Sequence, residues 1–170
     1  MAENTEQNNK LFGGAVVLEV CDGSPDKTPK ETDWKSLMAG TSKGLDYSPN
    51  TVTSDADDQG GYVESIVTNV DMSLSFEGEV RTNDALDEYG FFNLERYFNN
   101  EVSHKRQPSI WVRLMYGENT FVAYMNITSI SWSGGTNDLV TASLEFKVAS
   151  SKSVKITGKV AAPQQSKTQQ

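Results

Sequence analysis

The sequence predicts a mainly β protein: a β-sandwich or barrel of about six to eight antiparallel strands, flanked by one α-helix. Apolar and polar residues alternate through several segments, which is typical of strands with one buried and one wet face. One segment, residues 91–98, instead repeats its apolar residues at the helical period. The chain has 170 residues, the length of a single domain, which we place at residues 11–158.

The first third of the chain predicts one strand and then irregular structure. Ala15–Val20 is apolar and β-branched, and residues 22–26 follow it with turn-forming side chains. Trp34 and Leu37 are three residues apart, so a single helical turn would bury both. Residues 41–62 are rich in Gly, Ser, Asn, Asp and Thr. We therefore expect a long acidic loop there, of a length that usually has a function.

The middle of the chain changes its period once. Within Thr68–Val80, apolar residues alternate with polar ones: Val70, Met72, Leu74 and Phe76 against Asp71, Ser73, Ser75 and Glu77. This pattern predicts a half-buried antiparallel strand. Phe91, Leu94 and Phe98 then lie on one face of a helix, which we expect at about 84–99 with acidic residues in its first turn.

Three strands and one edge strand are predicted for the last third. Alternation runs through Ile110–Tyr116 and Val122–Trp132, with a hairpin turn between them, and again through Leu139–Val148. The apolar phase shifts near Thr128 and Ser129, which predicts a β-bulge. Val154 and Ile156 favour a short edge strand. The polar ends at 1–10 and 159–170 are expected to be flexible arms.

Composition limits the classes of function. The net charge is −8, which argues against sequence-independent binding of nucleic acid but suits a surface that DNA slides past. The single cysteine, Cys21, allows no internal disulfide. The N-terminus lacks the pattern of a signal peptide, and no apolar run approaches the length of a membrane span. We therefore expect no membrane association and folding in a cytoplasm.

Catalytic machinery is not evident in the sequence. His104 is the only histidine and lies beside Lys105 and Arg106, so we interpret it as a loop residue. The chain has no zinc ligand set, phosphate-binding loop or dinucleotide motif. Glu77 and Glu79 share one strand face, as a glycosidase pair would, but exposed strands often carry such pairs. We expect no enzyme activity and no cofactor.

Two further readings stay open. Asp55-Ala56-Asp57-Asp58-Gln59-Gly60 has acidic residues and a glycine at calcium-loop positions, but Ile66 stands where the bidentate glutamate belongs. A solvated acidic loop, or one that meets a partner's cations, is the competing interpretation. Trp34, Trp111 and Trp132 fit either a stacking platform for sugars or bases, or aromatic residues of the core or of a subunit interface.

In their order, these segments resemble the major tail tube protein of long-tailed phages, including the lambda-like siphophages. The likeness covers roughly residues 11–158. It rests on the first strand, the alternating strand Val70–Val80, the final strands and four short motifs. These motifs are Asp33-Trp34-Lys35-Ser36-Leu37, Leu45-Asp46-Tyr47-Ser48, Asp55-Ala56-Asp57-Asp58 and Tyr97-Phe98-Asn99-Asn100-Glu101.

The resemblance implies a structural virion protein that is assembled in the host cytoplasm and located in the phage tail. Subunits of this family form hexameric rings whose inner sheets join into one β-lined tube. The rings stack around a tape-measure protein, and DNA later passes through the lumen without specific binding. The implied partners are other copies of the chain, the tape-measure protein, the tail terminator and baseplate or tail-tip proteins.

The resemblance and the patterning together suggest three groups of site residues. The long loop is expected to contact a neighbouring subunit through Leu45, Asp46, Tyr47, Asp55, Asp57, Asp58 and Tyr62. The cations that would receive it are Arg96, Lys105 and Arg106, across a head-to-tail contact of the kind that makes open filaments. The lumen is expected to be lined by Asp71, Ser73, Ser75, Glu77, Thr141, Ser143 and Glu145.

Two alternatives remain at this point. The first is a tube protein of the same fold in a bacterial secretion system or tail-like system, which would form stable free hexamers without phage partners. The second is a carbohydrate-binding β-sandwich, which would be monomeric and would change its tryptophan fluorescence on titration with sugars.

Overall fold

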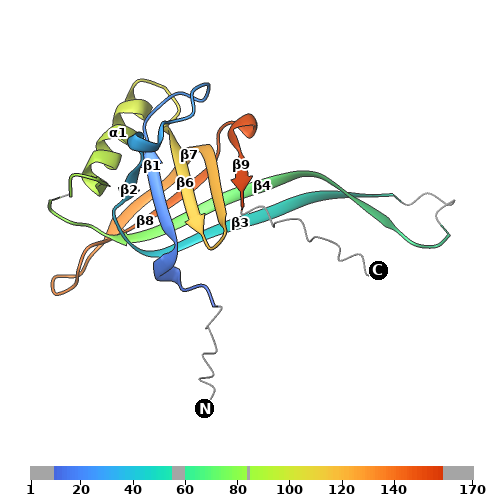
Figure 1. Ribbon diagram of the computed structural model, residues 1–170, viewed down its shortest axis with the longest axis horizontal. Coiled ribbons are helices and arrows are strands. Elements are labelled where there is room, and N and C mark those ends of the chain that lie inside the picture. The colour runs from blue at the N-terminus through green and yellow to red at the C-terminus, as the bar shows by residue number, and fades with distance from the viewer. Residues whose placement is uncertain (1–9, 55–59, 84, 159–170) are drawn as a thin grey trace, which may run out of the picture.

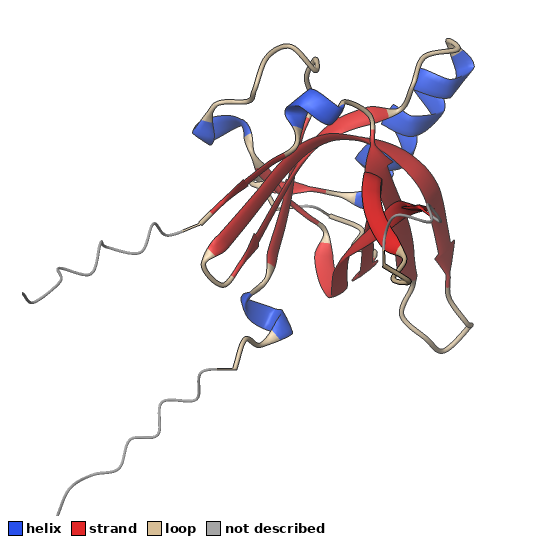
Figure 2. Ribbon diagram, turned by 90° about the vertical axis from the view of Figure 1, so that its right-hand side faces the viewer, coloured by secondary structure: helices blue, strands red, loops and turns tan. Residues whose placement is uncertain are grey.

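The computed structural model describes residues 10–54, 60–83 and 85–158, which form a curved β-sheet with one helix packed against it (Figures 1 and 2). Its strands are β1 (Val17–Cys21), β2 (Lys35–Leu37), β3 (Ala39–Ser54), β4 (Glu64–Glu79), β5 (Glu88–Tyr89), β6 (Ser109–Tyr116), β7 (Asn119–Ser133), β8 (Thr141–Val148) and β9 (Lys155–Thr157). The helix α1 spans Phe91–Ser103. The predicted mainly β fold with one flanking helix is confirmed.

All nine strands belong to one sheet. Their order is β3-β4-β8-β7-β6-β1-β2-β5, and β9 pairs with β7 beside this path. Every pair is antiparallel except β2 with β5. Figure 2 shows that the sheet arches. We call its β4–β8 part and its β1–β6 part, which β7 separates in the strand order, its two layers. The strand β7 runs through both layers, because it pairs with β6 along its first half and with β8 along its second.

The core is one cluster of buried residues to which both layers contribute. The alternating residues of β4 and β8 supply Leu74, Phe76, Leu144 and Phe146, each at most 3% exposed. They join one cluster with apolar residues of β1, β6 and β7. Leu94 of α1 is fully buried as well, so the helix closes one end of the same cluster. Removing these side chains from water is the dominant stabilising contribution to such a fold.

The predicted loop at 41–62 is wrong for most of its length. Residues 41–54 belong to β3, which pairs with β4 from Ala39↔Glu79 to Ser54↔Glu64. Beyond Asn50 both faces of this ribbon are exposed, so the sequence carries no alternation there. Small polar residues without apolar alternation predict a loop, and it is the pairing with β4 that makes this segment a strand. Residues 55–59 lie outside the described part of the chain.

The prediction of a helical turn at Trp34–Leu37 is also wrong. The expected helical turn over Trp34–Leu37 is strand β2, and a short 3-10 helix precedes it at Glu31–Asp33. The Asp33 carboxylate accepts a hydrogen bond from the Lys30 backbone N–H at 3.0 Å. This bond stabilises the helical turn at residues 31–33, just before the predicted position.

The helix begins at Phe91 and ends at Ser103, whereas the sequence predicted about 84–99. Gly90, its N-cap, is extended (φ −77°, ψ 162°), and the residues just before it form β5, which pairs with β2. At the other end, Lys105 takes the left-handed conformation (φ 56°). The Arg106 N–H then donates to the Glu101 carbonyl, a common way to close a helix.

The strands, the hairpin turn and the bulge predicted for the last third of the chain are confirmed, although β8 begins at Thr141 rather than at Leu139. The β7–β8 register shifts between Ile127 and Ser129, where the apolar phase predicted a bulge. The β6–β7 hairpin turns at Gly117, with φ 58°. The short strand β9 pairs with β7, as the edge strand at 154–156 suggested. No helix in the described ranges is both long and apolar enough to cross a bilayer.

The outer parts of β3 and β4 extend well beyond the body of the molecule (Figure 1). We call the residues from Pro49 to Ser54 and from Glu64 to Val70 the arm. They pair with each other up to Ser54↔Glu64 and have no other strand beside them among the described residues. An isolated two-stranded ribbon is only marginally stable in water. The arm is therefore a segment that gains most from a partner.

Candidate assembly surfaces

One face of the sheet is polar across β4 and β8. The strands pair Ser73 with Lys147, Ser75 with Glu145 and Glu77 with Ser143. Directly opposed residues in antiparallel strands point to the same side. The sequence-predicted lumen residues therefore share one face: Asp71, Ser73, Ser75, Glu77, Thr141, Ser143 and Glu145.

The polar face extends over both neighbouring strands, which the sequence prediction missed. On β3, Asp46 pairs with Ser73 and Ser48 with Asp71. On β7, three serines at alternate positions pair with β8: Ser129, Ser131 and Ser133. Their spacing after the predicted bulge is the signal that would have found them. We call the exposed side of β3, β4, β8 and β7 the polar face.

Charge on the polar face is mainly negative. Its carboxylates are Asp46, Asp71, Glu77, Glu79 and Glu145. Lys147 is its one lysine within the described residues, and its Nζ lies 3.0 Å from Oδ2 of Asp71. This hydrogen bond raises the pKa of Lys147, so that cation stays charged and is neutralised locally. The remaining carboxylates give the face an acidic surface.

The polar face ends at a free backbone edge on each side. In the described part of the chain, β3 pairs only with β4. The end of β7, from Ser129 to Ser133, pairs only with β8, because β6 stops opposite Asn126. Free edges are templates for pairing with another strand, and proteins commonly block them with charged side chains. Residues 129–133 carry no charged side chain.

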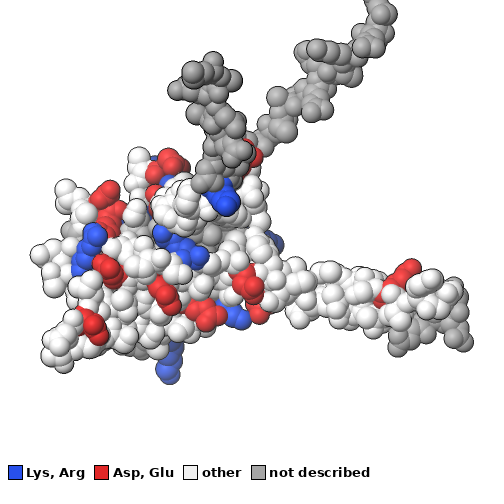
Figure 3. Space-filling view, turned by 90° about the horizontal axis from the view of Figure 1, so that it is seen from below, with Lys and Arg blue, Asp and Glu red and all other residues white. Residues whose placement is uncertain are grey.

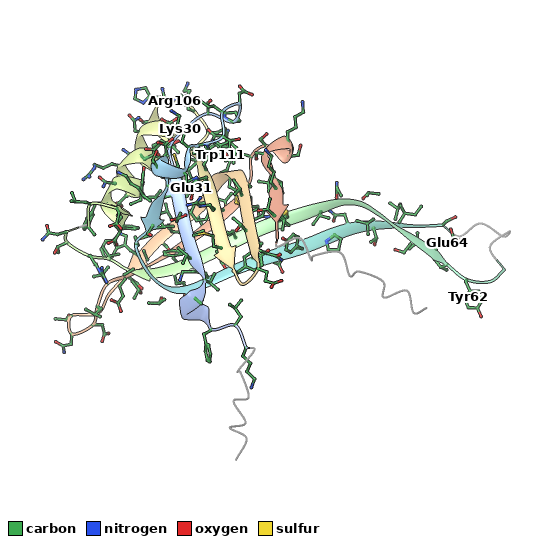
Figure 4. All side chains as sticks on the ribbon, viewed as in Figure 1. Lys30, Glu31, Tyr62, Glu64, Arg106 and Trp111 are labelled. Carbon is green, nitrogen blue, oxygen red and sulfur yellow. The ribbon has the colours of Figure 1, made fainter. Side chains whose placement is uncertain are left out.

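The arm carries exposed apolar side chains and few charges (Figure 3). Its exposed fractions are high: Val52 53%, Ile66 58%, Val67 57% and Val70 47%. Glu64 lies at its far end, and Tyr62, 84% exposed, lies just beyond it (Figure 4). Exposed apolar groups that cluster on a projecting ribbon are typical of an interaction surface.

The predicted interface residues do not form one cluster. Leu45, Asp46 and Tyr47 lie on the part of β3 that packs on the body, whereas Tyr62 lies just beyond the end of the arm. Asp55, Asp57 and Asp58 fall outside the described residues. The predicted contact loop is thus divided between a body segment and a projecting segment.

The predicted cations lie on or just after α1, away from the arm (Figure 4). Arg106 forms a two-point pair with Glu101 of its own copy, with Nε–Oε2 at 2.9 Å and Nη2–Oε1 at 2.7 Å. This pair lowers the pKa of Glu101 and raises that of Arg106. Arg96 donates to the Asn93 side chain. A contact with a neighbour's carboxylates would have to share or replace these bonds.

A second ion-pair cluster, which sequence reasoning missed, lies on the β1–β6 layer. Arg113 of β6 donates to Glu19 of β1 and to both carboxylate oxygens of Glu31. Its guanidinium also stacks on the Trp34 ring, 4.8 Å from the ring centre. Arg113 is only 9% exposed, so the cluster fixes the 22–34 segment to the sheet.

The groups considered for catalysis or metal binding have structural contacts. His104 Nδ1 lies 2.8 Å from the Asn100 carbonyl oxygen at the end of the helix. Cys21 is buried, and burial raises its thiol pKa. The described residues contain no cluster of three or more metal-ligating side chains. Most of the calcium-like motif is outside them.

The three tryptophans have different surroundings rather than one shared platform. Trp111 is buried and donates to the Ser24 carbonyl at 3.0 Å, and Trp34 contacts Arg113. Trp132, near the end of β7, is 59% exposed. It lines an apolar groove of about 350 Å³ together with Val80, Phe91, Phe92 and Val140.

Comparisons with known proteins identify the fold. No family model matches the chain, and no curated protein matches its sequence. Among solved structures, a chain of the tail of an empty gene transfer agent particle, refined with C6 symmetry, aligns with a TM-score of 0.61 and 13% identity, over 88% of this chain and 98% of the other. A chain of the SPP1 tail tube aligns with a TM-score of 0.57 and 13% sequence identity, over 89% of this chain and 81% of the other.

A third match is a chain of the sixfold-symmetrised baseplate of the anti-feeding prophage. Its TM-score is 0.57 with 12% identity, over 85% of this chain and 94% of the other. These structures are similar to this chain over most of its length. The chain therefore has the fold of tail tube subunits, as its sequence motifs suggested.

Proposed function

We propose that this protein is the subunit of a phage tail tube, in which hexameric rings stack to form a hollow conduit for DNA. The observation that carries the proposal is the polar face, which spans four strands and ends in a free edge on each side. A sheet of this kind is incomplete alone and complete when a neighbouring copy continues it. The sixfold symmetry of the structurally similar tail supports a ring of six.

Strand direction favours a continuous inner sheet. The pairs β3–β4, β4–β8 and β8–β7 are all antiparallel, so β7 runs opposite to β3. The edge of β3 in the next copy would therefore meet β7 in antiparallel orientation without any change of direction. Closure of the ring removes both free edges, which is how β-barrels avoid edge-to-edge aggregation.

The chemistry of the polar face suits a lumen. Serine and threonine side chains are small, and the surplus carboxylates repel the phosphates of a passing DNA. No cluster of arginines or lysines, which strong phosphate binding requires, is present on the described part of this face. We infer that DNA moves past this wall without specific binding.

The arm supplies a second contact. It projects from the body with apolar groups on both of its sides, so it can bury them only against another molecule. We propose that it contacts a neighbouring copy. The interface residues predicted from the sequence belong to the same proposal: Leu45, Asp46, Tyr47, Asp55, Asp57, Asp58 and Tyr62. Their predicted cationic partners on that copy remain Arg96, Lys105 and Arg106.

The proposed role is structural rather than enzymatic, and its setting is the virion tail. The further partners proposed from the family resemblance are the tape-measure protein, the tail terminator and baseplate or tail-tip proteins. The domain division at residues 11–158, with arms at 1–10 and 159–170, belongs to the same proposal.

Electron microscopy of the purified full chain tests the function directly. Negative staining at high protein concentration is expected to show rings or hollow tubes of sixfold symmetry. Material that stays monomeric at every concentration, and also in the presence of the other tail proteins, would contradict a tube subunit.

A tube protein of a related tail-like system is the second candidate, favoured by the likeness to the anti-feeding prophage baseplate chain. It predicts free hexamers that persist without phage partners, which size-exclusion chromatography with light scattering measures. The carbohydrate-binding alternative has less support, because the tryptophans do not form one platform. A fluorescence titration with sugars that gave saturable binding by a monomer would restore it.

A further inference from the structure

We propose that Trp132 of one copy packs against the Tyr47 edge of the next copy, so that one aromatic contact sets the side-to-side fit of the ring. This inference rests on the proposed tube function and names residues for its ring contact. The partner is a second copy of this chain. Three observations support it.

Trp132 is an unusual surface residue. It lies on the final part of β7, whose outer backbone edge is unpaired among the described residues. Its ring is 59% exposed and forms one wall of the groove beside Phe92 and Val140. A tryptophan buries a large apolar area when covered, and such residues dominate the binding energy of many interfaces.

The opposite edge of the sheet offers an apolar hollow. A cavity of about 270 Å³ opens between β3 and the ends of β1 and β6. Its lining includes Leu45 and Tyr47 of β3 with Leu114 and Tyr116 of β6. Tyr47 is 44% exposed at this edge. Partial burial, and then the neighbouring Tyr116 side chain, raise the pKa of Tyr47. The hollow is therefore lined by two aromatic side chains, one from β3 and one from β6.

Both features lie on the same side of the sheet. Trp132 pairs with Ala142, and Ala142 pairs with Gly78, on the buried side opposite the polar face. Tyr47 pairs with Met72, which is also on the buried side. When a neighbour's β3 adds to the edge of β7, Trp132 and Tyr47 therefore project in the same direction, away from the polar face.

The contact also requires a stagger between the copies. Within one copy Trp132 is level with Gly40, through Ala142 and Gly78, so the neighbour's β3 must be offset by the seven residues from Gly40 to Tyr47. Closing a sheet of tilted strands into a tube requires the register to be staggered. Adjacent strands lie about 4.7–4.9 Å apart, and side chains on one face of neighbouring strands touch. The two apolar features sit at opposite edges of one copy, so the contact is heterologous and repeats around a ring. The aromatic contact would lie behind the lumen wall, leaving the polar face continuous.

Substitution of Trp132, with a matched control, tests the contact. Trp132→Ala is expected to raise the protein concentration needed for ring or tube formation at least tenfold, and Trp132→Phe by less. The control is Leu139→Ala, which removes an apolar side chain that is 71% exposed, against 59% for Trp132, from the adjoining β7–β8 turn. It should assemble like the wild type. Thermal unfolding of the unassembled proteins checks that each variant is folded.

Tryptophan fluorescence reports on the contact without removing the aromatic side chain. The difference between wild-type and Trp132→Phe emission isolates Trp132, and it should shift to the blue when tubes form. A double variant, Trp132→Cys with Tyr47→Cys, should form disulfide-linked ladders between copies on mild oxidation, whereas either single variant should not.

The outcomes separate this inference from the function. Tubes that form with an unchanged Trp132 emission and no cross-linked ladder would overturn the aromatic contact and leave the tube function standing. A wild type that never assembles would overturn the function, and the contact with it. A blue shift and a ladder together would support both.

Discussion

Arg113 and Glu31 form a two-point contact across 82 residues of sequence: Nη1 of Arg113 lies 2.7 Å from Oε1 and 2.8 Å from Oε2 of Glu31. The same guanidinium donates from its Nε to Glu19, at 2.6 Å. Burial opposes the charge of Arg113, but the two carboxylates outweigh it and raise its pKa. The cluster thus keeps a nearly buried cation charged and ties the segment 22–34 to the β1–β6 layer.

Arg113→Met is expected to destabilise the protein by about 3 kcal/mol, because it leaves the largely buried carboxylate of Glu19 unpaired. Urea denaturation of the unassembled protein measures this. Arg106→Met is the matched control, since it also removes a two-point arginine pair, but from an exposed position: the side chains are 54% and 11% exposed for Arg106 and Arg113. If both variants lost the same free energy of unfolding, burial would not explain the contribution of the Arg113 cluster to stability.

A close packing of Phe76 on two paired glycines makes a second prediction. Gly40 and Gly78 are register partners, and the Phe76 ring covers both. A Cβ at Gly78 would lie 2.9 Å from the ring and 2.9 Å from the Ala39 carbonyl oxygen. We expect Gly78→Ala to lower the free energy of unfolding by about 1–3 kcal/mol through overpacking.

The control for this variant is Gly14→Ala, because nothing lies within 4 Å of a Cβ at Gly14. Its effect should stay within about 0.5 kcal/mol. Thermal melts of both variants make the comparison. A stable Gly78→Ala protein would mean that the Phe76 ring can move away at little cost.

Tyr97 predicts a loss of stability at high pH. Burial, and then the charge of Glu101, raise the pKa of Tyr97 to about 12 from an ordinary value of 10. The unfolded chain therefore loses this proton first, so the stabilisation is complete below pH 10 and is lost as the pH rises toward 12. The loss should be smaller in Tyr97→Phe. The test is to measure the urea midpoints of the wild type and of Tyr97→Phe across this pH interval. If the midpoints of both proteins fell with pH at the same rate, Tyr97 would not be the source of the loss.

The buried strands could be predicted from the sequence, whereas the exposed ribbon could not. Met72, Leu74 and Phe76 alternate because one side of β4 meets the core, and the same alternation identified the polar face. In the arm both sides are wet, so no period marks residues 49–54 as a strand. The bulge at Ile127–Ser129 was predictable because the apolar phase shifts on the same strand.

Contacts between distant segments were beyond the sequence. Arg113 reaches Glu19 over 94 residues and Glu31 over 82, and no local pattern marks such a cluster. The free edges could not be predicted for the same reason: alternation identifies a strand, but it does not show which strands pair with it. The pairing order β3-β4-β8-β7 was needed to show that one face continues from Asp46 to Ser133.

The arm allows assembly to be separated from folding. Val52 and Ile66 are register partners, 53% and 58% exposed, and neither packs on the body. We expect Val52→Ser with Ile66→Ser to leave the melting temperature of the unassembled protein nearly unchanged and to abolish tubes in negative stain. Val102→Ser, which alters a residue 50% exposed on α1, is the control and should still form tubes. Normal tubes from the arm variant would show that the arm makes no essential contact.

Charge reversal on the polar face tests its proposed role as a lumen wall. Glu77→Lys with Glu145→Lys turns two carboxylates of this face into cations without touching the core side of β4 or β8. The tubes should still form, because neither residue lies at a sheet edge, but they should now retain short double-stranded DNA. Binding should weaken steeply as salt is raised, since it would arise from released counterions. Glu118→Lys, in the exposed β6–β7 turn, makes a charge change of the same kind away from the face. Similar DNA retention by both variants would place the polar face somewhere other than the lumen.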